Sequence, residues 1–167
     1  MRTPARRLVQ GLPPVIGPGA RVLILGSFPS SLSLAAGQYY ANPKNQFWKI
    51  MDALVAIDPS LPYGDRLSRL ISCRIALWDA IASCRRQGSA DSTITGACGN
   101  PLDDLLASHP GIRLIACNGS ASARSLAACP PANVTILRLP STSPAYARMP
   151  LAGKIRAWSA ICRYLDR

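Results

Sequence analysis

The residues best suited to chemistry in this sequence follow short apolar segments. Asp79 ends the run Ile75–Asp79, and Asn118 ends the run Ile112–Asn118. The turn Gly26–Ser30 follows a third apolar run, and its backbone N–H groups could face an anion or an oxyanion. A carboxyl group and an amide at such places can hydrogen-bond the N–H edge of a ligand or assist a water molecule. These residue types predict a site that works by positioning.

A second group of candidates lies in the segment Gln38–Trp48. Asn42 and Asn45 flank Pro43, which indicates that Asn42 caps a helix whose first residue is Pro43. Asn45 lies two residues before Phe47. An uncharged amide there can orient a water molecule, and an aromatic face offers a stacking platform for a nucleobase.

The third group occupies the loop from Leu139 to Arg148. Small hydroxyl residues lie between two prolines, and an aromatic and a basic residue follow. Hydroxyls and backbone amides suit contacts with phosphates, and an aromatic side chain can wedge into a base stack. The candidate DNA-binding residues of this loop are Pro140, Ser141, Thr142, Ser143, Tyr146 and Arg148.

Each candidate also has a simpler structural interpretation. The sequence Gly-Ser-Phe-Pro is compatible with a plain turn, and Asp79 with the cap of a following helix. Asn118 and Gly119 together are typical of a turn. The proline-rich loop, taken alone, reads as an ordinary polar connection.

Several kinds of site are disfavoured by missing motifs. The sequence has neither the glycine-rich phosphate loop that ends in Gly-Lys-Ser/Thr nor the G-x-G-x-x-G of dinucleotide-binding folds. Its single histidine, His109, precedes Pro110 at the end of a predicted helix, which favours a capping or solvent role. The six cysteines have no C-x-x-C spacing, so we expect reduced, structural thiols and no metal or iron–sulfur site.

Strands that alternate with helices must position these residues. Apolar runs predict buried strands over Arg21–Gly26, Ile75–Asp79, Ile112–Asn118 and Val134–Leu139. Apolar spacing predicts helices over 47–55, 64–72, 102–108, 120–129 and 152–164, with Ser120 as an N-cap. This alternation is typical of a parallel sheet covered on both faces, whose ligands bind at the carboxyl ends of the strands.

Composition narrows the class of protein and of partner. The chain has 167 residues, the size of one domain, and we expect a single domain over 1–167. A hydrophobic fraction of 49% excludes a disordered chain, and 19 Lys and Arg against 8 Asp and Glu give a net charge of +11. That charge favours a polyanionic partner. No apolar run approaches the length of a membrane span, and no secretory signal is evident, so we expect a cytoplasmic monomer.

Five sequence segments together resemble those of the uracil-DNA glycosylase superfamily, specifically its hypoxanthine-DNA (deoxyinosine) glycosylase branch, family 6. They are VLILGSFPS, AGQYYANPKNQFWKIM, IALWDAI, CNGSASA and LPSTSPAYA, in the order and spacing of the family. The segment ANPKNQFWKI also resembles the mismatch-specific uracil and thymine glycosylases. The similarity extends from about Leu12 to Trp158, which is nearly the whole chain.

The resemblance implies an α/β fold, a three-layer α/β/α sandwich with a central four-stranded parallel sheet. It implies a monofunctional glycosylase of base excision repair that hydrolyses the N-glycosidic bond of a deaminated base, hypoxanthine, flipped out of double-stranded or single-stranded DNA, without cofactor or metal. Asn45 matches the catalytic asparagine, and Phe47 matches the aromatic that stacks on the base. Asp79 falls where uracil enzymes read the base, and the loop Pro140–Arg148 matches the one that contacts phosphates and enters the duplex. The remaining base-binding candidates are Gly26, Ser27, Phe28 and Asn118.

Departures from the family pattern bear on the substrate. Phe28 stands where uracil and mismatch enzymes carry a water-directing Asp or Asn, so Asn45 must supply that role. Leu139 replaces the histidine that stabilises a uracil anion, which argues against strong uracil activity. Tyr146 stands where relatives more often have Asn, and Cys117 replaces a common aromatic.

Two alternatives remain open at this stage. One is a uracil or xanthine glycosylase of the same superfamily, and the other is a non-catalytic DNA-binding relative. Intact Asn45 and Phe47 argue against the second alternative. No lysine is placed as a nucleophile, so lyase activity is not predicted.

Overall fold

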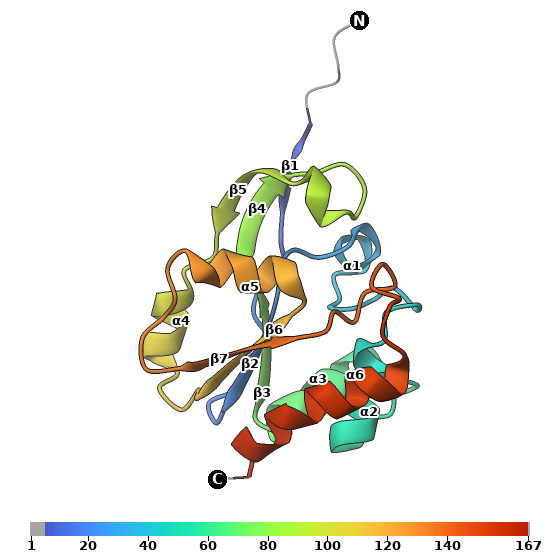
Figure 1. Ribbon diagram of the computed structural model, residues 1–167, viewed down its shortest axis with the longest axis vertical. Coiled ribbons are helices and arrows are strands. Elements are labelled where there is room, and N and C mark those ends of the chain that lie inside the picture. The colour runs from blue at the N-terminus through green and yellow to red at the C-terminus, as the bar shows by residue number, and fades with distance from the viewer. Residues whose placement is uncertain (1–5, 167) are drawn as a thin grey trace, which may run out of the picture.

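Four short apolar strands form the parallel sheet at the centre of the molecule. The computed structural model describes residues 6–166, and the sheet has the order β3-β2-β6-β7 (Figure 1). All three neighbouring pairs run parallel. The four predicted strands are confirmed to within two residues: β2 (Val22–Gly26), β3 (Ile75–Asp79), β6 (Leu114–Asn118) and β7 (Thr135–Leu139).

Helices cover both faces of this sheet. Val22 and Ile24 belong to a buried cluster with α2 (Phe47–Val55), α3 (Tyr63–Ser72) and α6 (Leu151–Trp158). Leu23 and Leu25 point the other way, toward α4 (Leu102–Ser108) and α5 (Ser120–Ala127). Alternate residues of a strand face opposite sides of its sheet, so one run of apolar residues supplies both layers. Figure 1 shows these two helical layers, and the predicted three-layer α/β/α sandwich is confirmed.

Three details of the predicted helices are wrong. Asn42 does not cap helix α2, which begins at Phe47 as the apolar spacing predicts; Asn42 Oδ1 instead accepts a hydrogen bond from Lys44 N within a separate turn. The N-cap position of α5 is Gly119 instead of Ser120, with a φ of +94° that favours glycine. The tail is α-helical only to Trp158 and then continues as the 3₁₀ helix η2 (Ser159–Tyr164).

A second, antiparallel sheet stands beyond the carboxyl end of β3 and was not predicted. It has the order β1-β4-β5, formed by β1 (Leu8–Gln10), β4 (Ile81–Arg85) and β5 (Thr95–Gly99). Strand β4 follows β3 almost directly, so the expectation that Asp79 caps a helix is wrong. The 3₁₀ helix η1 (Asp91–Thr93) joins β4 to β5, and the short helix α1 (Ser31–Ala36) follows β2 (Figure 1).

Smaller expectations are settled by local contacts. His109 occupies the C-cap position of α4, where its Nδ1 lies 3.0 Å from the carbonyl oxygen of Leu105. All six cysteines are free thiols. In the described part of the chain, no helix is long and apolar enough to cross a membrane.

Candidate active site

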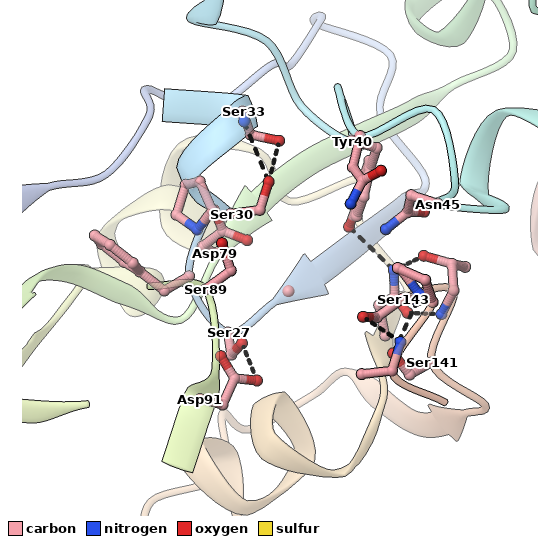
Figure 2. Close-up of a pocket in the computed structure, with 18 of the residues that line it drawn as sticks. Ser27, Ser30, Ser33, Tyr40, Asn45, Asp79, Ser89, Asp91, Ser141 and Ser143 are labelled. Carbon is pink, nitrogen blue, oxygen red and sulfur yellow. Dashed lines mark hydrogen bonds between the residues drawn. The ribbon is translucent and has the colours of Figure 1, made fainter. Parts of the chain in front are cut away.

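A pocket of about 340 Å³ opens at the carboxyl ends of the central strands. This volume lies within the roughly 300–1,000 Å³ that is usual for small-molecule sites. Segments far apart in the sequence meet there (Figure 2). The lining residues are Gly26, Ser27, Phe28, Pro29, Ser30, Ser33, Tyr39, Tyr40, Asn42, Asn45, Asp79, Ser89, Ala90, Asp91, Asn118, Ser141, Thr142, Ser143, Pro144 and Ala145.

The pocket brings together most of the residues that the sequence singles out. The residues found in its wall are Gly26, Ser27, Phe28, Asn45, Asp79, Asn118, Ser141, Thr142 and Ser143. Four others lie outside the wall: Phe47, Pro140, Tyr146 and Arg148. In Figure 2, Asp79 and Ser30 lie on one side of the end of β2, and Asn45 and Tyr40 lie on the other.

Asn45 is held at the amino end of α2. Its Oδ1 accepts a hydrogen bond of 2.9 Å from the backbone N–H of Phe47. An amide oxygen has a second lone pair, and the Nδ2 group has two protons to donate. The side chain is therefore oriented by the helix while it keeps the capacity to bind a water molecule in the pocket.

Phe47 lies behind the pocket wall. Its side chain is fully buried, and its ring stacks on that of Tyr40 with a centroid distance of 4.0 Å and an interplanar angle of 22°. Tyr40 lines the pocket and has a left-handed backbone conformation, with a φ of +56°. The aromatic residues that line the pocket are Tyr39, Tyr40 and Phe28, and Phe47 supports Tyr40 from behind.

Asp79 places a buried carboxyl group in the wall. The residue is 5% exposed, and its Oδ2 atom has no hydrogen-bond partner among the described residues. Burial and, to a smaller extent, the negative charge of Asp91 raise the pKa of Asp79, while the guanidinium of Arg86 lowers it, and the net pKa is about 7. At neutral pH, this site therefore holds a carboxyl group that carries its proton much of the time.

Asn118 connects the sheet to the loop that follows β7. Its Oδ1 accepts a hydrogen bond of 3.0 Å from Thr142 N, and its Nδ2 donates to Thr142 Oγ1 and Tyr40 Oη at 3.0 and 3.2 Å. Burial raises the pKa of Tyr40, and the charge of Asp79 adds to the effect. Asn118 is thus committed to holding the two sides of the pocket together.

The outer part of the loop 140–148 rests on α6. The indole of Trp158 donates a hydrogen bond of 2.9 Å to the carbonyl oxygen of Pro140. The ammonium of Lys154, which is 1% exposed, donates at 2.8 Å to the carbonyl oxygen of Tyr146. The side chains of Tyr146 and Arg148 are exposed, so they are available to a large partner outside the pocket.

The sequence reasoning missed the contribution of the β4–β5 connection. Ser89 and Asp91 line the pocket, and Asp91 Oδ2 accepts a hydrogen bond of 2.9 Å from Ser27 Oγ. Ser89 Oγ accepts from the backbone N–H of Ser31 at 2.9 Å. No local pattern in the sequence marks these residues, whereas Tyr40 lies inside the candidate segment Gln38–Trp48 and could have been included.

The geometry suits hydrolysis of a polar, planar ligand. Aromatic rings can hold a flat molecule, Asn45 can hold water, and Asp79 can exchange a proton on the other side of β2 (Figure 2). Among residues 6–166, no group of three or more His, Cys, Asp and Glu side chains could hold a metal ion.

Comparisons with known proteins agree with this arrangement. The family model of the uracil DNA glycosylase superfamily matches residues 13–162. A protein named Hypoxanthine DNA glycosylase from Methanosarcina barkeri is 36% identical over 114 residues, which cover 68% of this chain and 72% of that protein. One of the same name from Methanosarcina acetivorans is 37% identical over 111 residues, which cover 66% of this chain and 70% of that protein.

A solved structure extends the similarity to the whole fold. It is the solution NMR structure of a candidate uracil DNA glycosylase from Methanosarcina acetivorans, with a TM-score of 0.85 and 31% identity. The match covers 96% of this chain and 100% of that chain. The family model covers most of the chain and a relative is 36% identical over 68% of it, so the chain belongs to the uracil DNA glycosylase superfamily.

Proposed function

We propose that this protein is a monofunctional DNA glycosylase that hydrolyses the N-glycosidic bond of hypoxanthine in DNA. The observation that carries the proposal is the pocket in which the Asn45 amide and the Asp79 carboxyl group are brought together at the strand ends. Membership of the superfamily and two relatives named Hypoxanthine DNA glycosylase support this choice of substrate. The enzyme would begin base excision repair at deaminated adenine.

The reaction starts when the damaged nucleotide rotates out of the base stack. Unstacking costs least where base pairing is already poor. The exposed Tyr146 and Arg148, with the hydroxyl groups of Ser141 and Ser143, contact the phosphates and the opened duplex. The loop thereby supports the extrahelical state of the nucleotide.

Inside the pocket the base lies against aromatic rings. Phe28 and Tyr40 provide contact surface, with Phe47 behind Tyr40. Backbone groups of Gly26 and Ser27, together with Asp79, read the edge of the base, while Asn118 fixes the wall that Tyr40 and Thr142 share.

Hydrolysis needs a water molecule aimed at C1′ of the sugar. Asn45 holds this water as the bond to the base lengthens toward an oxocarbenium-like state. None of the described residues that line the pocket is a lysine, in keeping with a monofunctional enzyme that lacks a lyase step. Leu139 offers no imidazole to a uracil anion, which favours hypoxanthine over uracil.

The decisive experiment uses labelled duplexes with one deoxyinosine, deoxyuridine or deoxyxanthosine, treated with protein and then with hot alkali. We expect strand breaks chiefly at deoxyinosine. Asn45→Ala should reduce the single-turnover rate at least about 100-fold, because a positioned catalytic group typically contributes that much. Gln10→Ala, which removes an exposed amide on β1, is the matched control and should excise at the normal rate.

Other outcomes would change the conclusion in defined ways. Breaks chiefly at deoxyuridine or deoxyxanthosine would retain a glycosylase and replace its substrate. Binding of duplex DNA without any breaks would instead establish a DNA-binding relative with no catalysis.

We also propose that the enzyme acts as a single-domain monomer in the cytoplasm. Light scattering after size-exclusion chromatography, with and without an inosine duplex, measures the oligomeric state. A stable dimer in both samples would contradict it.

A further inference from the structure

The carboxyl group of Asp79 is fixed in place although one of its oxygens is unsatisfied. The carbonyl oxygen of Asp79 accepts a hydrogen bond of 2.7 Å from Asn100 Nδ2, which anchors the backbone at the end of β3. The side chain packs against Gly26, the last residue of β2. Oδ2 is buried, has no partner among the described residues, and belongs to a residue that lines the pocket. A buried polar atom without a protein partner calls for an explanation, such as a bound water or ligand or a catalytic role, and the position of Asp79 in the pocket wall makes a ligand a suitable partner.

The groups around Asp79 compensate its negative charge only in part. Arg86, after β4, is the cation that acts on it, but that guanidinium donates to the carbonyl oxygen of Pro29 and lies over the Phe28 ring at 4.9 Å. Asp91 of η1 opposes Arg86 with a negative charge, and Asp79 in turn raises the pKa of both Tyr39 and Tyr40. Burial contributes most, so the pKa of Asp79 lies at about 7 and the neutral acid is well populated near neutrality.

A purine base that leaves the sugar needs a proton, which such an acid can provide. When the N9–C1′ bond breaks, its electron pair goes to the purine, which then needs a proton or other stabilisation. The one histidine of the sequence, His109, caps α4 and does not line the pocket. Asp79 lies across the end of β2 from Asn45, so one residue can supply the proton while the other holds the water molecule (Figure 2).

We propose that Asp79 is the general acid of this site and gives its carboxyl proton to an acceptor atom of the hypoxanthine ring as the base leaves. The inference rests on the proposed function and adds a catalytic step to it. The N9–C1′ bond breaks, a bond forms between the proton and the purine, and water adds to C1′. Water loses one proton to solvent and the Asp79 carboxylate takes one back, so the sum is the consumption of one water molecule.

The first test is the pH dependence of single-turnover excision from an inosine duplex between pH 5 and 9. The acid must be protonated to act, so the wild-type rate should fall about tenfold per pH unit above the pKa of Asp79. Asp79→Asn keeps the size of the side chain and removes the proton. This variant should be at least about 100-fold slower at pH 6 and should lose that alkaline decline.

A second variant tests the electrostatic origin of the effect without altering the acid. Asp91→Asn removes the negative charge that raises the pKa of Asp79, so the midpoint of the alkaline decline should move to lower pH. Asp104→Asn, on exposed α4, is the matched control and should leave the midpoint unchanged. If Asp79→Asn fails to fold in a thermal melt, this shift decides the question alone.

A third test separates proton donation from a structural role. In a duplex that carries N7-methyl-deoxyinosine, a fixed positive charge makes a donated proton unnecessary. Asp79→Asn should excise this base within about threefold of the wild-type rate, once spontaneous loss is subtracted, whereas Asn45→Ala should remain slow.

The outcomes distinguish the inference from the function beneath it. A wild-type enzyme that leaves deoxyinosine intact overturns both. If the wild type is active, three results would each contradict the role of Asp79 as general acid and leave the glycosylase activity in place. They are an unchanged pH profile in Asp79→Asn, a wild-type rate that rises with pH through this range, and an Asp79→Asn variant that stays slow on N7-methyl-deoxyinosine.

Discussion

At the scale of single residues, Gly26 and Asp79 pack closely against each other in the pocket wall. These residues pair across β2 and β3 at the carboxyl end of the sheet. A Cβ atom at position 26 would overlap Oδ1 of Asp79 and would come within 3.6 Å of the Tyr40 hydroxyl. Glycine is needed here for space, because the carboxyl group occupies the volume that any side chain would take.

The first prediction therefore concerns Gly26→Ala. The added methyl group should displace the Asp79 carboxyl group and reduce deoxyinosine excision at least about tenfold. Forcing a methyl into a filled site usually costs about 1–3 kcal/mol of stability. Gly19→Ala is the matched control, since a Cβ there meets nothing within 4 Å. Single-turnover rates and thermal melts of both variants check this, and equal rates for the two would contradict it.

Tyr40 and Phe47 show how one aromatic position is built from two residues. Phe47 is surrounded by Tyr40 on one face and by Trp48 and Trp158 at its edges, with centroid distances of 4.9 and 6.2 Å to the two tryptophans. A ring enclosed in this way fixes its neighbour and cannot itself reach a ligand unless Tyr40 moves. The stacking role expected for Phe47 stays a prediction, and the structure makes Tyr40 the ring in contact with the pocket.

At the scale of elements, helix α6 holds the loop 140–148 in place. Trp158 fixes the start of the loop and Lys154 fixes its outer part, while Gln46 N donates at 3.0 Å to the Thr142 carbonyl oxygen. A loop that must open a duplex gains from such anchoring, because its conformational entropy is lost before DNA binds. Lys154 also lies 5.3 Å from the Tyr146 ring centroid, so both backbone and ring depend on it.

The second prediction is that Lys154→Met separates duplex opening from chemistry. Replacing Lys154 with an apolar side chain leaves the Tyr146 carbonyl oxygen without its donor, which typically costs about 1–3 kcal/mol of stability, while loss of the desolvated ammonium, whose pKa burial lowers, offsets part of that cost. Excision should fall about tenfold more on paired deoxyinosine than on single-stranded DNA, because only the duplex must be opened. Arg156→Met, on the exposed side of α6, is the matched control. Equal losses on both substrates would assign Lys154 a different role.

The burial of each strand explains which parts of the fold could be predicted from sequence. The strands β2, β3 and β6 are buried on both faces, so their apolar runs are continuous and unambiguous. Strand β5 has the sequence Thr-Gly-Ala-Cys-Gly and is exposed throughout, so it lacks apolar alternation, and its one β-branched residue, Thr95, does not mark a strand between two glycines. Its position depends on pairing with β4, which is a tertiary interaction that no local pattern reports.

The residues of the candidate site also differ in how far the sequence could predict their positions. Asp79 and Asn118 end predicted strands, so strand topology alone places them at one edge of the sheet. Asn45 precedes the predicted helix over 47–55, and its place in the pocket depends on how that helix packs. Asp91 reaches the pocket only because the β4–β5 connection folds back onto Ser27. The stacking role of Phe47 was predicted from its residue type and from the family resemblance, and neither of these reports whether the side chain is exposed.

At the scale of the whole molecule, charge and topology act together. The net charge of +11 attracts DNA without regard to sequence, and the parallel strands place all their carboxyl ends at the edge that carries the pocket. Lys44 and Arg148 are exposed and belong to segments that form or adjoin the pocket wall. Arg113 is also exposed, but it precedes β6 at the opposite, amino edge of the sheet.

The last prediction follows from this separation of charges. Each phosphate neutralised by the protein releases counterions, so the logarithm of the DNA affinity should fall linearly with the logarithm of salt concentration, by about 0.9 per contact. Lys44→Ala and Arg148→Ala should each reduce the magnitude of that slope by about 1, whereas Arg113→Ala should leave it unchanged. Fluorescence anisotropy with an undamaged labelled duplex between 50 and 200 mM salt measures the slopes. If Arg113→Ala reduced the salt slope as much as the other two variants, DNA would be attracted to the whole surface of the protein. Recognition of the damaged base would then depend on contacts inside the pocket and not on basic residues arranged around it.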